Sequence, residues 1–357
     1  MKILYFAPVS WGWIKQRPHF IAENLAAMGN EVLYLCRVPF LRHRKETLVL
    51  NRHLRAVTLP VLPLALKLPV VEKFNNFLLR KRVPWREYDA VILGDPRLVY
   101  ALPEKLDVPV IYDCMDNNPG FFTGRVKEHL HRAEKALLQR ADRVICSAEA
   151  LKRQLRENYN FSGKIDVVRN GASGNFLHSV SGSGEAAVPA DFLYVGTIER
   201  WLDWDNLAAF ARKYPEKNIT LTGPVKYAPA GLPANILLTG RCSHDQVLSR
   251  LKQAKVLLLP FTVNELTRAV DPVKMYEYLA CGGNVVSAWW EELEYFRSSG
   301  GVSFYRDPEE FEKAMCAAWE SAGTRVENPA FLRENCWEQR AVAYCNILQN
   351  ALLCREM

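Results

Sequence analysis

Residues 271–287, DPVKMYEYLACGGNVVS, begin with the pattern of a helix and end with that of a buried strand. Asp271 is a residue type that caps helices, and Pro272 suits a first helical position. Gly282 predicts the end of the helix. Between them, apolar side chains recur at the spacing of one helix face, at Val273, Tyr276, Leu279 and Ala280. The stretch therefore predicts one helix-to-strand unit of an α/β domain.

The same predicted helix carries Lys274 and Glu277 one turn apart. It follows an expected strand at 256–261, so its start lies at the carboxyl end of a sheet, where open α/β sheets bind ligands. Free N–H groups at a helix start attract phosphate, and Lys274 adds a positive charge. Glu277 is suited to accept hydrogen bonds from ribose hydroxyls. Alternatively, the two form a surface pair worth about 0.2–0.5 kcal/mol to their own helix. The residues alone leave both interpretations open.

Short apolar strands alternate with amphipathic helices through both halves of the chain, which predicts parallel sheets covered on both faces. Residues 178–190 are poor in large apolar side chains and rich in Ser and Gly, as linkers are. The sequence therefore predicts a first domain at 1–177 and a second at 191–357. Expected helix caps include Asp205 and Ser243. Strands are expected at residues 2–8, 31–36, 89–95, 108–114, 142–147, 164–170, 191–198, 218–224, 235–241, 256–261 and 284–290.

The composition is that of a soluble globular protein, with 357 residues, 49% hydrophobic and 24% charged. The opening residues MKILYFAPVSWGW lack a small-residue cleavage site and predict a first strand rather than a signal peptide. The 9 cysteines form no C-x-x-C pair and their total is odd. A disulfide framework or a zinc site is therefore not expected, and a reducing cytoplasm fits.

Positive charge is concentrated near the start of the chain. The net charge is +7, and residues 1–90 hold 15 Lys and Arg against 6 Asp and Glu. Such a basic region predicts an anionic partner. Residues 37–85 interleave apolar and basic side chains, which favours an anionic membrane surface over a partly buried helix pair with a basic rim. No nucleic-acid-binding module is recognisable, so nucleic acid is not expected.

Asp113 and Asp116 follow an expected strand in the segment YDCMDN. A hydroxyl that attacks an anomeric carbon with inversion needs a carboxylate or His nearby as base, and Asp116, further into the loop, is the candidate. The alternative is that either carboxylate bonds backbone in the turn or caps a helix.

The loop VSWGWIKQRPHF, residues 9–20, lacks the glycine fingerprint of a dinucleotide site, which argues against a nicotinamide-dependent oxidoreductase. Trp13, Arg17 and His19 in this loop suit a sugar or a lipid phosphate and are candidate acceptor-binding residues. Arg17 and His19 are equally ordinary residues of a first helical turn, and for His19 that interpretation is favoured.

The pattern D-P-x-K-x-x-E-Y-L-A-x-G from Asp271 resembles the donor-site motif of GT-B glycosyltransferases. More narrowly, the chain resembles bacterial enzymes of capsule, teichuronic acid and exopolysaccharide synthesis. The segments VPVIYDCMDN, VVRNGAS and LYVGTIERWLDWDNL and the closing helix resemble theirs in the same order. The resemblance implies two Rossmann-like α/β/α domains facing a cleft, with a C-terminal helix that packs back toward the first domain.

The resemblance also implies a function and its site. A nucleotide-diphosphate sugar would be held by the second domain. A hexosyl group would pass to an acceptor, expected to be a lipid-linked saccharide at the inner face of the plasma membrane. Neither a metal nor another cofactor is expected. Lys274 would act in catalysis beside Asp116. The expected donor-binding residues are Gly196, Thr197, Arg200, Asp271, Lys274 and Glu277.

Two departures from the family pattern bear on the chemistry. Retaining members often carry a glutamate eight residues before Glu277, where this chain has Ala269. Thr197 and Leu202 stand where an Arg and a Lys are usual. Two other classes of function therefore stay open: a nucleotide-sugar epimerase on the same fold, and a non-catalytic scaffold for membrane glycosyltransferases.

Overall fold

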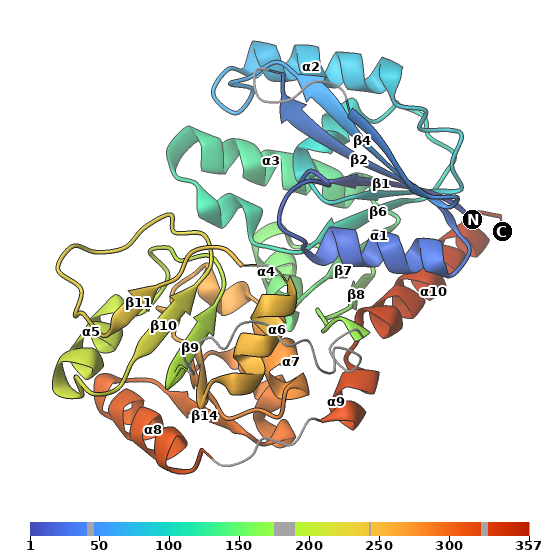
Figure 1. The fold of residues 1–357 in the computed structure, drawn as a ribbon. Helices are drawn as coiled ribbons and strands as arrows, with labels where there is room; N and C mark the ends of the chain where they lie inside the picture. The colour runs from blue at the N-terminus through green and yellow to red at the C-terminus, as the bar shows by residue number, and fades with distance from the viewer. Residues whose placement is uncertain (41–45, 175–189, 243, 323–327, 357) are drawn as a thin grey trace. The chain divides into compact units, whose positions relative to one another are not determined.

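The computed structural model describes residues 1–40, 46–174, 190–242, 244–322 and 328–356. Contacts divide the chain into two compact units (Figure 1). Unit 1 comprises Met1–Arg169 and Trp337–Met357, and unit 2 comprises Asn170–Cys336. The sequence placed the first boundary at 177 and the whole C-terminal part in the second domain. The C-terminal residues belong to unit 1 because the last helix packs on the first helix of that unit. Most of the expected linker, 178–190, lies outside the described residues.

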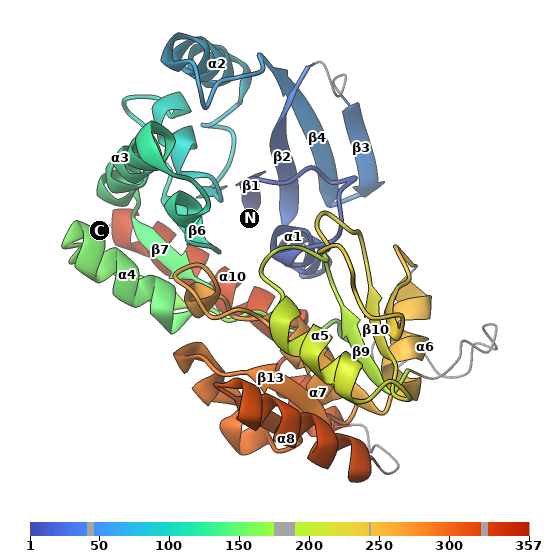
Figure 2. The same ribbon diagram turned by 90° about the vertical axis from the view of Figure 1, so that its left-hand side faces the viewer.

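Unit 1 is built on an eight-stranded sheet in the order β3-β4-β2-β1-β5-β6-β7-β8. Its strands pair in parallel except β3, which runs antiparallel to β4 at the edge of the sheet (Figure 2). The central strands are short runs of buried apolar residues, as strands covered on both faces require. The strands are β1 Lys2–Ala7, β2 Glu31–Pro39, β3 Glu46–Asn51, β4 Leu54–Val61, β5 Ala90–Leu93, β6 Val110–Cys114, β7 Arg143–Cys146 and β8 Ile165–Val167.

The helices of unit 1 include the C-terminal helix of the chain, which packs on the first helix. Phe20 of the first helix stacks on Trp337 at the start of the last, with 4.9 Å between ring centroids. The expectation that the C-terminal helix packs back on the first domain is thus confirmed. The helices are α1 Arg17–Ala27, α2 Pro69–Arg82, α3 Gly124–Arg140, α4 Glu149–Tyr159 and α10 Trp337–Glu356, with 3-10 turns η1 Pro96–Ala101 and η2 Asn118–Phe121.

Unit 2 has a six-stranded parallel sheet in the order β11-β10-β9-β12-β13-β14. The predicted class, two Rossmann-like domains with mainly parallel sheets, is confirmed. The strands are β9 Phe192–Val195, β10 Ile219–Thr222, β11 Ile236–Leu238, β12 Val256–Leu259, β13 Val285–Ala288 and β14 Val302–Tyr305. The helices are α5 Trp204–Lys213, α6 His244–Gln253, α7 Val273–Ala280, α8 Pro308–Glu320 and α9 Pro329–Glu334, with 3-10 turns η4 Thr267–Ala269 and η5 Glu291–Ser299.

Two expected helix caps are wrong. Helix α5 begins at Trp204 because the carboxylate of Asp203 accepts from the Asn206 N–H at 3.4 Å, so Asp205 lies in the first turn. Tyr305 donates to the same carboxylate at 3.1 Å and holds it there. Helix α7 begins at Val273 after Pro272, and Asp271 does not cap it. Ser243 lies outside the described residues.

Candidate functional site

Asp116 lies just after β6, at the carboxyl edge of the unit 1 sheet. Its carbonyl oxygen accepts from the Asn118 N–H at 2.9 Å. The cap of η2 is Asn117, whose side chain accepts from the Gly120 N–H at 3.2 Å. Within the described parts of the chain, the Asp116 carboxylate makes no hydrogen bond or ion pair. The side chain is therefore neither the helix cap nor an internal brace.

The pKa of Asp116 is raised to about 7, chiefly by burial, while the positive charge of Arg17 opposes the rise and the negative charge of Asp113 adds to it. Part of the residue nevertheless keeps contact with solvent. A carboxylate with a pKa near neutrality is present in its basic form at pH 7 and still binds a proton well. That combination is what general base catalysis requires.

Asp113 lies fully inside unit 1 and serves the packing of that unit. Tyr5 and Tyr344 donate to its carboxylate, the latter at 2.6 Å, and the Arg17 Nε lies 3.4 Å away. Three side chains from β1, α1 and α10 thus satisfy this buried charge, rather than the turn backbone. Asp113 and Asp116 are three residues apart in sequence, but of the two only Asp116 has no hydrogen-bond or ion-pair partner among the described residues.

Arg17 is only 4% exposed. Its guanidinium donates to the Tyr344 hydroxyl at 2.8 Å and to the Arg169 carbonyl at 3.2 Å, besides its contact with Asp113. Arg17 is therefore an interior residue, and its positive charge partly offsets the rise in the pKa of Asp116. Its expected contact with an acceptor stays a prediction that this burial does not favour.

His19 forms part of the first turn of α1. Its Nδ1 accepts from the Gln16 N–H at 3.0 Å, and its Nε2 lies 3.1 Å from the Ser10 carbonyl. Burial lowers the pKa of His19, so the ring is neutral at pH 7 and donates through Nε2. This geometry favours the interpretation of His19 as an ordinary residue of the first helical turn over a role in acceptor binding. Trp13, in contrast, is 46% exposed in the loop after β1 and remains a candidate acceptor contact.

In unit 2, Lys274 and Glu277 lie on α7 as a pair, with 2.6 Å between Nζ and a carboxylate oxygen. The Lys274 side chain is 30% exposed and that of Glu277 is 9% exposed. A partly open lysine held by a nearly buried glutamate is more constrained than a surface pair. The geometry fits a positioned cation at the start of α7.

Gly196 and Thr197 follow β9 at the carboxyl edge of the unit 2 sheet. The Gly196 N–H donates to the Thr222 carbonyl at 2.9 Å. Gly223 approaches Gly196 so closely that a Cβ on Gly223 would meet the Gly196 carbonyl oxygen, and its φ of +143° also favours glycine. The loops after β9 and β10 thus meet there backbone to backbone. Arg200 is exposed nearby in sequence, with its guanidinium 4.1 Å from the Tyr227 ring centroid.

A second cation, which the sequence did not single out, lies in the same unit. Arg250 of α6 donates to the hydroxyls of Thr222 at 3.1 Å and Thr239 at 2.8 Å. Burial raises the pKa of Cys242, and the positive charges of Arg250 and Lys274 both oppose that rise. No local pattern distinguished Arg250, because its partners lie on other elements.

Asp271 is 3% exposed and holds unit 2 together rather than facing outward. Its carboxylate accepts from the Asn170 N–H at 2.6 Å and from the Tyr276 hydroxyl at 2.9 Å. It positions the start of α7 from within, and its expected donor contact stays a prediction. Among the described residues, no group of three or more His, Cys, Asp or Glu side chains is placed to hold a metal ion.

Comparison with known families matches both halves of the chain. Residues 19–173 match the model of Glycosyltransferase Family 4, and residues 200–345 match that described as Glycosyl transferase-like. The solved sucrose-phosphate synthase of Thermosynechococcus elongatus has the same fold, with a TM-score of 0.76 over 99% of both chains at 15% identity. The chain has the two-domain GT-B fold, and each of its halves matches a glycosyltransferase family model.

Other GT-B structures agree in fold. The E. coli trehalose-6-phosphate structure bound with UDP-2-fluoro glucose matches with a TM-score of 0.72 and 11% identity, over 98% of this chain and 99% of that one. WaaG, a glycosyltransferase involved in lipopolysaccharide biosynthesis, matches with a TM-score of 0.66 and 13% identity, over 99% and 98%. At these identities the likeness concerns the GT-B fold alone.

A curated relative matches part of the GT-B chain in sequence. TuaH of Bacillus subtilis (strain 168), whose name assigns it to teichuronic acid biosynthesis as a glycosyltransferase, is 24% identical over 200 residues. The match spans 50% of this chain and 49% of TuaH, so about half of the relative's length is covered.

Proposed function

We propose that the protein transfers a sugar from a nucleotide-diphosphate donor to an acceptor hydroxyl. The observation that carries the proposal is the carboxylate of Asp116, which has a pKa of about 7 and, among the described residues, no partner. The two glycosyltransferase family matches support it. Lys274 and Arg250 in unit 2 supply positive charge of the kind a diphosphate needs.

The proposed chemistry uses the carboxylate of Asp116 and the positive charges of Lys274 and Arg250. Asp116 accepts the proton of the acceptor hydroxyl as its oxygen attacks the anomeric carbon of the donor. The bond from that carbon to the diphosphate oxygen breaks, and the electron pair leaves with the diphosphate. Lys274 and Arg250 stabilise the negative charge that develops there, without a metal ion. A base on the acceptor side fits inversion, in keeping with Ala269 where retaining relatives carry a glutamate.

Glu277 is proposed to hold the donor ribose, while Gly196, Thr197 and Arg200 belong to the loop that closes over the donor. A hexosyl donor is proposed from the family resemblance. Thermal unfolding with UDP, GDP and dTDP identifies the nucleotide, since a ligand at a hundred times its Kd stabilises by about 2.7 kcal/mol.

Lys274→Ala and Glu277→Ala test the donor site. Lys274→Ala should cost about 2.7–4 kcal/mol in the transition state, by analogy with the loss of one oxyanion donor. Glu277→Ala should weaken free nucleoside diphosphate as much as donor sugar, because both contain the ribose. Lys313→Ala, which removes an exposed lysine of α8, is the control. Unchanged calorimetric affinity and unchanged turnover in both variants would reduce the pair to a helix salt bridge and defeat the proposal.

The same measurements separate the competing functions. An epimerase would convert the donor without any acceptor, so donor turnover in the absence of acceptor would favour it. A scaffold would bind no nucleotide sugar at all. The pKa of Asp116 supports an enzyme over the scaffold, because a purely structural carboxylate gains nothing from an unpaired, desolvated position.

We further propose that the acceptor is a lipid-linked saccharide and that the protein lies against the inner face of the plasma membrane. On α2, Val70, Phe74 and Phe77 are 79%, 48% and 52% exposed, beside the exposed cations Lys73 and Lys81. These apolar side chains are not buried in a helix pair, which supports membrane contact. The names of TuaH and WaaG point to cell-surface polymers. Of the helices in the described residues, none has the length and apolarity to cross a bilayer.

Sedimentation with vesicles tests membrane association. The protein should sediment with vesicles that contain phosphatidylglycerol and detach as salt rises, because salt screens attraction between exposed charges. Equal sedimentation with neutral phosphatidylcholine vesicles would contradict the electrostatic part.

A further inference from the structure

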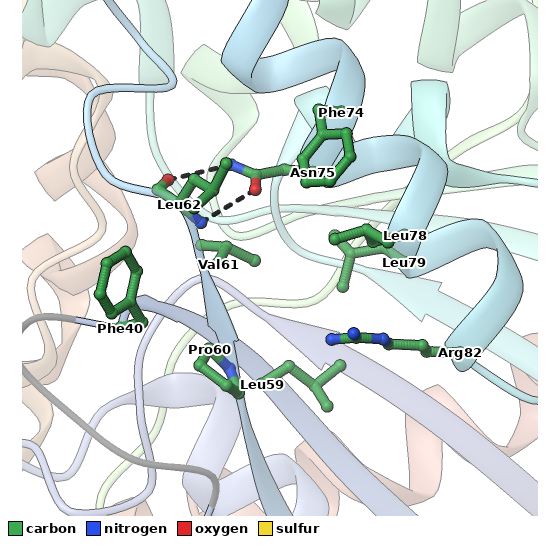
Figure 3. A pocket seen from close by; sticks show the side chains of 10 residues that line it. All are labelled: Phe40, Leu59, Pro60, Val61, Leu62, Phe74, Asn75, Leu78, Leu79 and Arg82. Carbon is green, nitrogen blue, oxygen red and sulfur yellow. Dashed lines mark hydrogen bonds between the residues drawn. The ribbon is translucent and has the colours of Figure 1, made fainter.

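A cavity of about 610 Å³ lies in unit 1 between α2 and the carboxyl ends of β2 and β4 (Figure 3). Its size falls within the roughly 300–1,000 Å³ of typical small-molecule sites. The wall is mostly apolar and includes Phe40, Leu59, Leu62, Phe74 and Leu78. None of the candidate catalytic or donor-binding residues lines it.

The described lining includes the polar side chains of Asn75 and Arg82, which differ in their hydrogen bonding within the protein. Asn75 is used by the protein itself: it accepts from the Leu62 N–H at 2.9 Å and donates to the Leu62 carbonyl at 3.0 Å. Among the described residues of the lining, Arg82 alone is charged and none is acidic. Figure 3 shows its side chain extending from the end of α2 across the cavity toward Leu59.

Arg82 makes no hydrogen bond or ion pair with any residue that the structure describes. Arg82 is exposed, so its guanidinium reaches solvent as well as the apolar lining. A guanidinium in this position is available to an anion, and its planar donors suit phosphate. The other end of the lining reaches the surface, where Phe40 and Phe74 are each 48% exposed. The described part of the lining therefore offers apolar volume together with the positive charge of Arg82.

The cavity is continuous with the face of α2 that we propose contacts the membrane. Phe74 belongs both to the lining and to that face, which also carries Val70, Phe77, Lys73 and Lys81. A hydrocarbon chain with an anionic head group complements both the apolar wall and the positive charge of Arg82.

We propose that this cavity binds one anionic phospholipid of the membrane, with a hydrocarbon chain against the apolar wall and the phosphate on Arg82. The inference rests on the membrane part of the proposed function. The acceptor's own lipid is a less suitable occupant, because β2, β1 and β5 separate β4 from β6, which precedes Asp116. Four strand spacings of about 4.8 Å place the cavity roughly 19 Å along the sheet from that base.

Alkyl phosphates below their aggregation concentration test the cavity without a membrane. Dodecyl phosphate should bind in a calorimetric titration, and the affinity should fall roughly fourfold for each methylene removed, as burial of a chain from water requires. Butyl phosphate, which is eight methylenes shorter, should therefore bind at least about a thousandfold more weakly. Dodecyl maltoside, which lacks the anionic charge, should bind at least about tenfold more weakly.

Two variants with matched controls locate the binding. Leu78→Trp fills the cavity and should weaken dodecyl phosphate about tenfold or more, whereas Val70→Trp adds the same ring to the exposed face and should not. Arg82→Gln should weaken it about tenfold, whereas Lys81→Gln removes the neighbouring charge with little effect. Circular dichroism checks folding, and Leu78→Phe is the milder substitute. Wild-type affinity in folded Leu78→Trp, or equal losses for Arg82→Gln and Lys81→Gln, would overturn the site.

Vesicles containing phosphatidylglycerol then identify the source of the lipid. Leu78→Trp should sediment several-fold less than the wild type if the cavity takes a bilayer phospholipid. Loss of dodecyl phosphate binding with unchanged sedimentation would overturn the phospholipid assignment and favour the acceptor's lipid. Failure of the wild type to sediment at all would defeat the membrane part of the proposed function, while the alkyl phosphate titration still decides whether the cavity binds an amphiphile.

Discussion

Replacing Asp116 by asparagine separates catalysis from stability, because the structure predicts opposite effects on the two. The carboxylate has a pKa of about 7, raised from 3.8 chiefly by burial, and has no hydrogen-bond or ion-pair partner in the described residues. As a base it should be required for turnover. As a desolvated charge it should cost folding free energy at neutral pH. A residue that merely shaped the turn would show neither effect.

The two magnitudes follow from the same pKa. Loss of a general base lowers turnover by roughly 10²–10⁴. A folded-state pKa above the unfolded value means that the stability from this group is present below about pH 4 and is lost as the pH rises through 7. At about 1.36 kcal/mol for each pH unit, Asp116→Asn should stabilise the fold by up to about 4 kcal/mol above pH 7. Residual solvent contact makes this an upper limit.

The test measures both the rate of the transfer reaction and the free energy of unfolding. Initial rates of nucleoside diphosphate release, measured from pH 5 to 9 with the preferred donor and acceptor, should rise through about pH 7 in the wild type. That ionisation should vanish in Asp116→Asn, whose affinity for the donor should be unchanged. Urea unfolding across the same pH range gives the stability difference. Asp107→Asn, an exposed aspartate in the loop before β6, is the control.

Near-normal turnover in Asp116→Asn with a good acceptor would remove the residue from the mechanism. A variant that is less stable than the wild type at pH 8 would refute the unpaired, desolvated state of the carboxylate. It would support the interpretation of Asp116 as a turn residue.

Three further predictions concern residues whose partners lie far away in sequence. Tyr344→Phe removes a hydroxyl bonded to the buried charges of Asp113 and Arg17 and should lower the free energy of unfolding by about 1–3 kcal/mol in urea titrations; a neutral effect would refute the brace. Burial raises the pKa of Glu134, so its contribution to stability is lost as the pH rises above 4.5, and Glu134→Gln should flatten the pH dependence of Tm; an unchanged profile would contradict this. Arg250→Gln should weaken the preferred nucleoside diphosphate about tenfold by calorimetry, and wild-type affinity would exclude it from the donor site.

The sequence alone was sufficient for the fold class and for most elements, but it did not predict the strands β3, β4 and β14. Alternating buried strands and amphipathic helices depend on residues two to four positions apart, and that spacing is visible in any chain. Lys274 and Glu277 were found in the same way, because one helical turn brings them together wherever the helix lies. The order of short motifs then indicated the GT-B fold, which the solved structures confirm, and glycosyltransferase family models match both halves of the chain.

Local sequence could not decide between equivalent candidates for one role. Asp203 and Asp205 both suit a helix cap, and the hydroxyl of Tyr305, about a hundred residues away, selects Asp203. Asp271 suits a cap as well, but Asn170 and Tyr276 bind its carboxylate inside unit 2.

Tertiary structure alone decided which charges are free to act. Asp113 and Asp116 look alike in the segment YDCMDN, yet Tyr5, Arg17 and Tyr344 satisfy the first and none of the described residues binds the second. The pKa of Asp116, the partners of Arg250 and the cavity beneath α2 likewise depend on packing between distant segments. The physical reason is that burial and charge pairing depend on what surrounds a side chain in space, and most of those neighbours come from other parts of the chain.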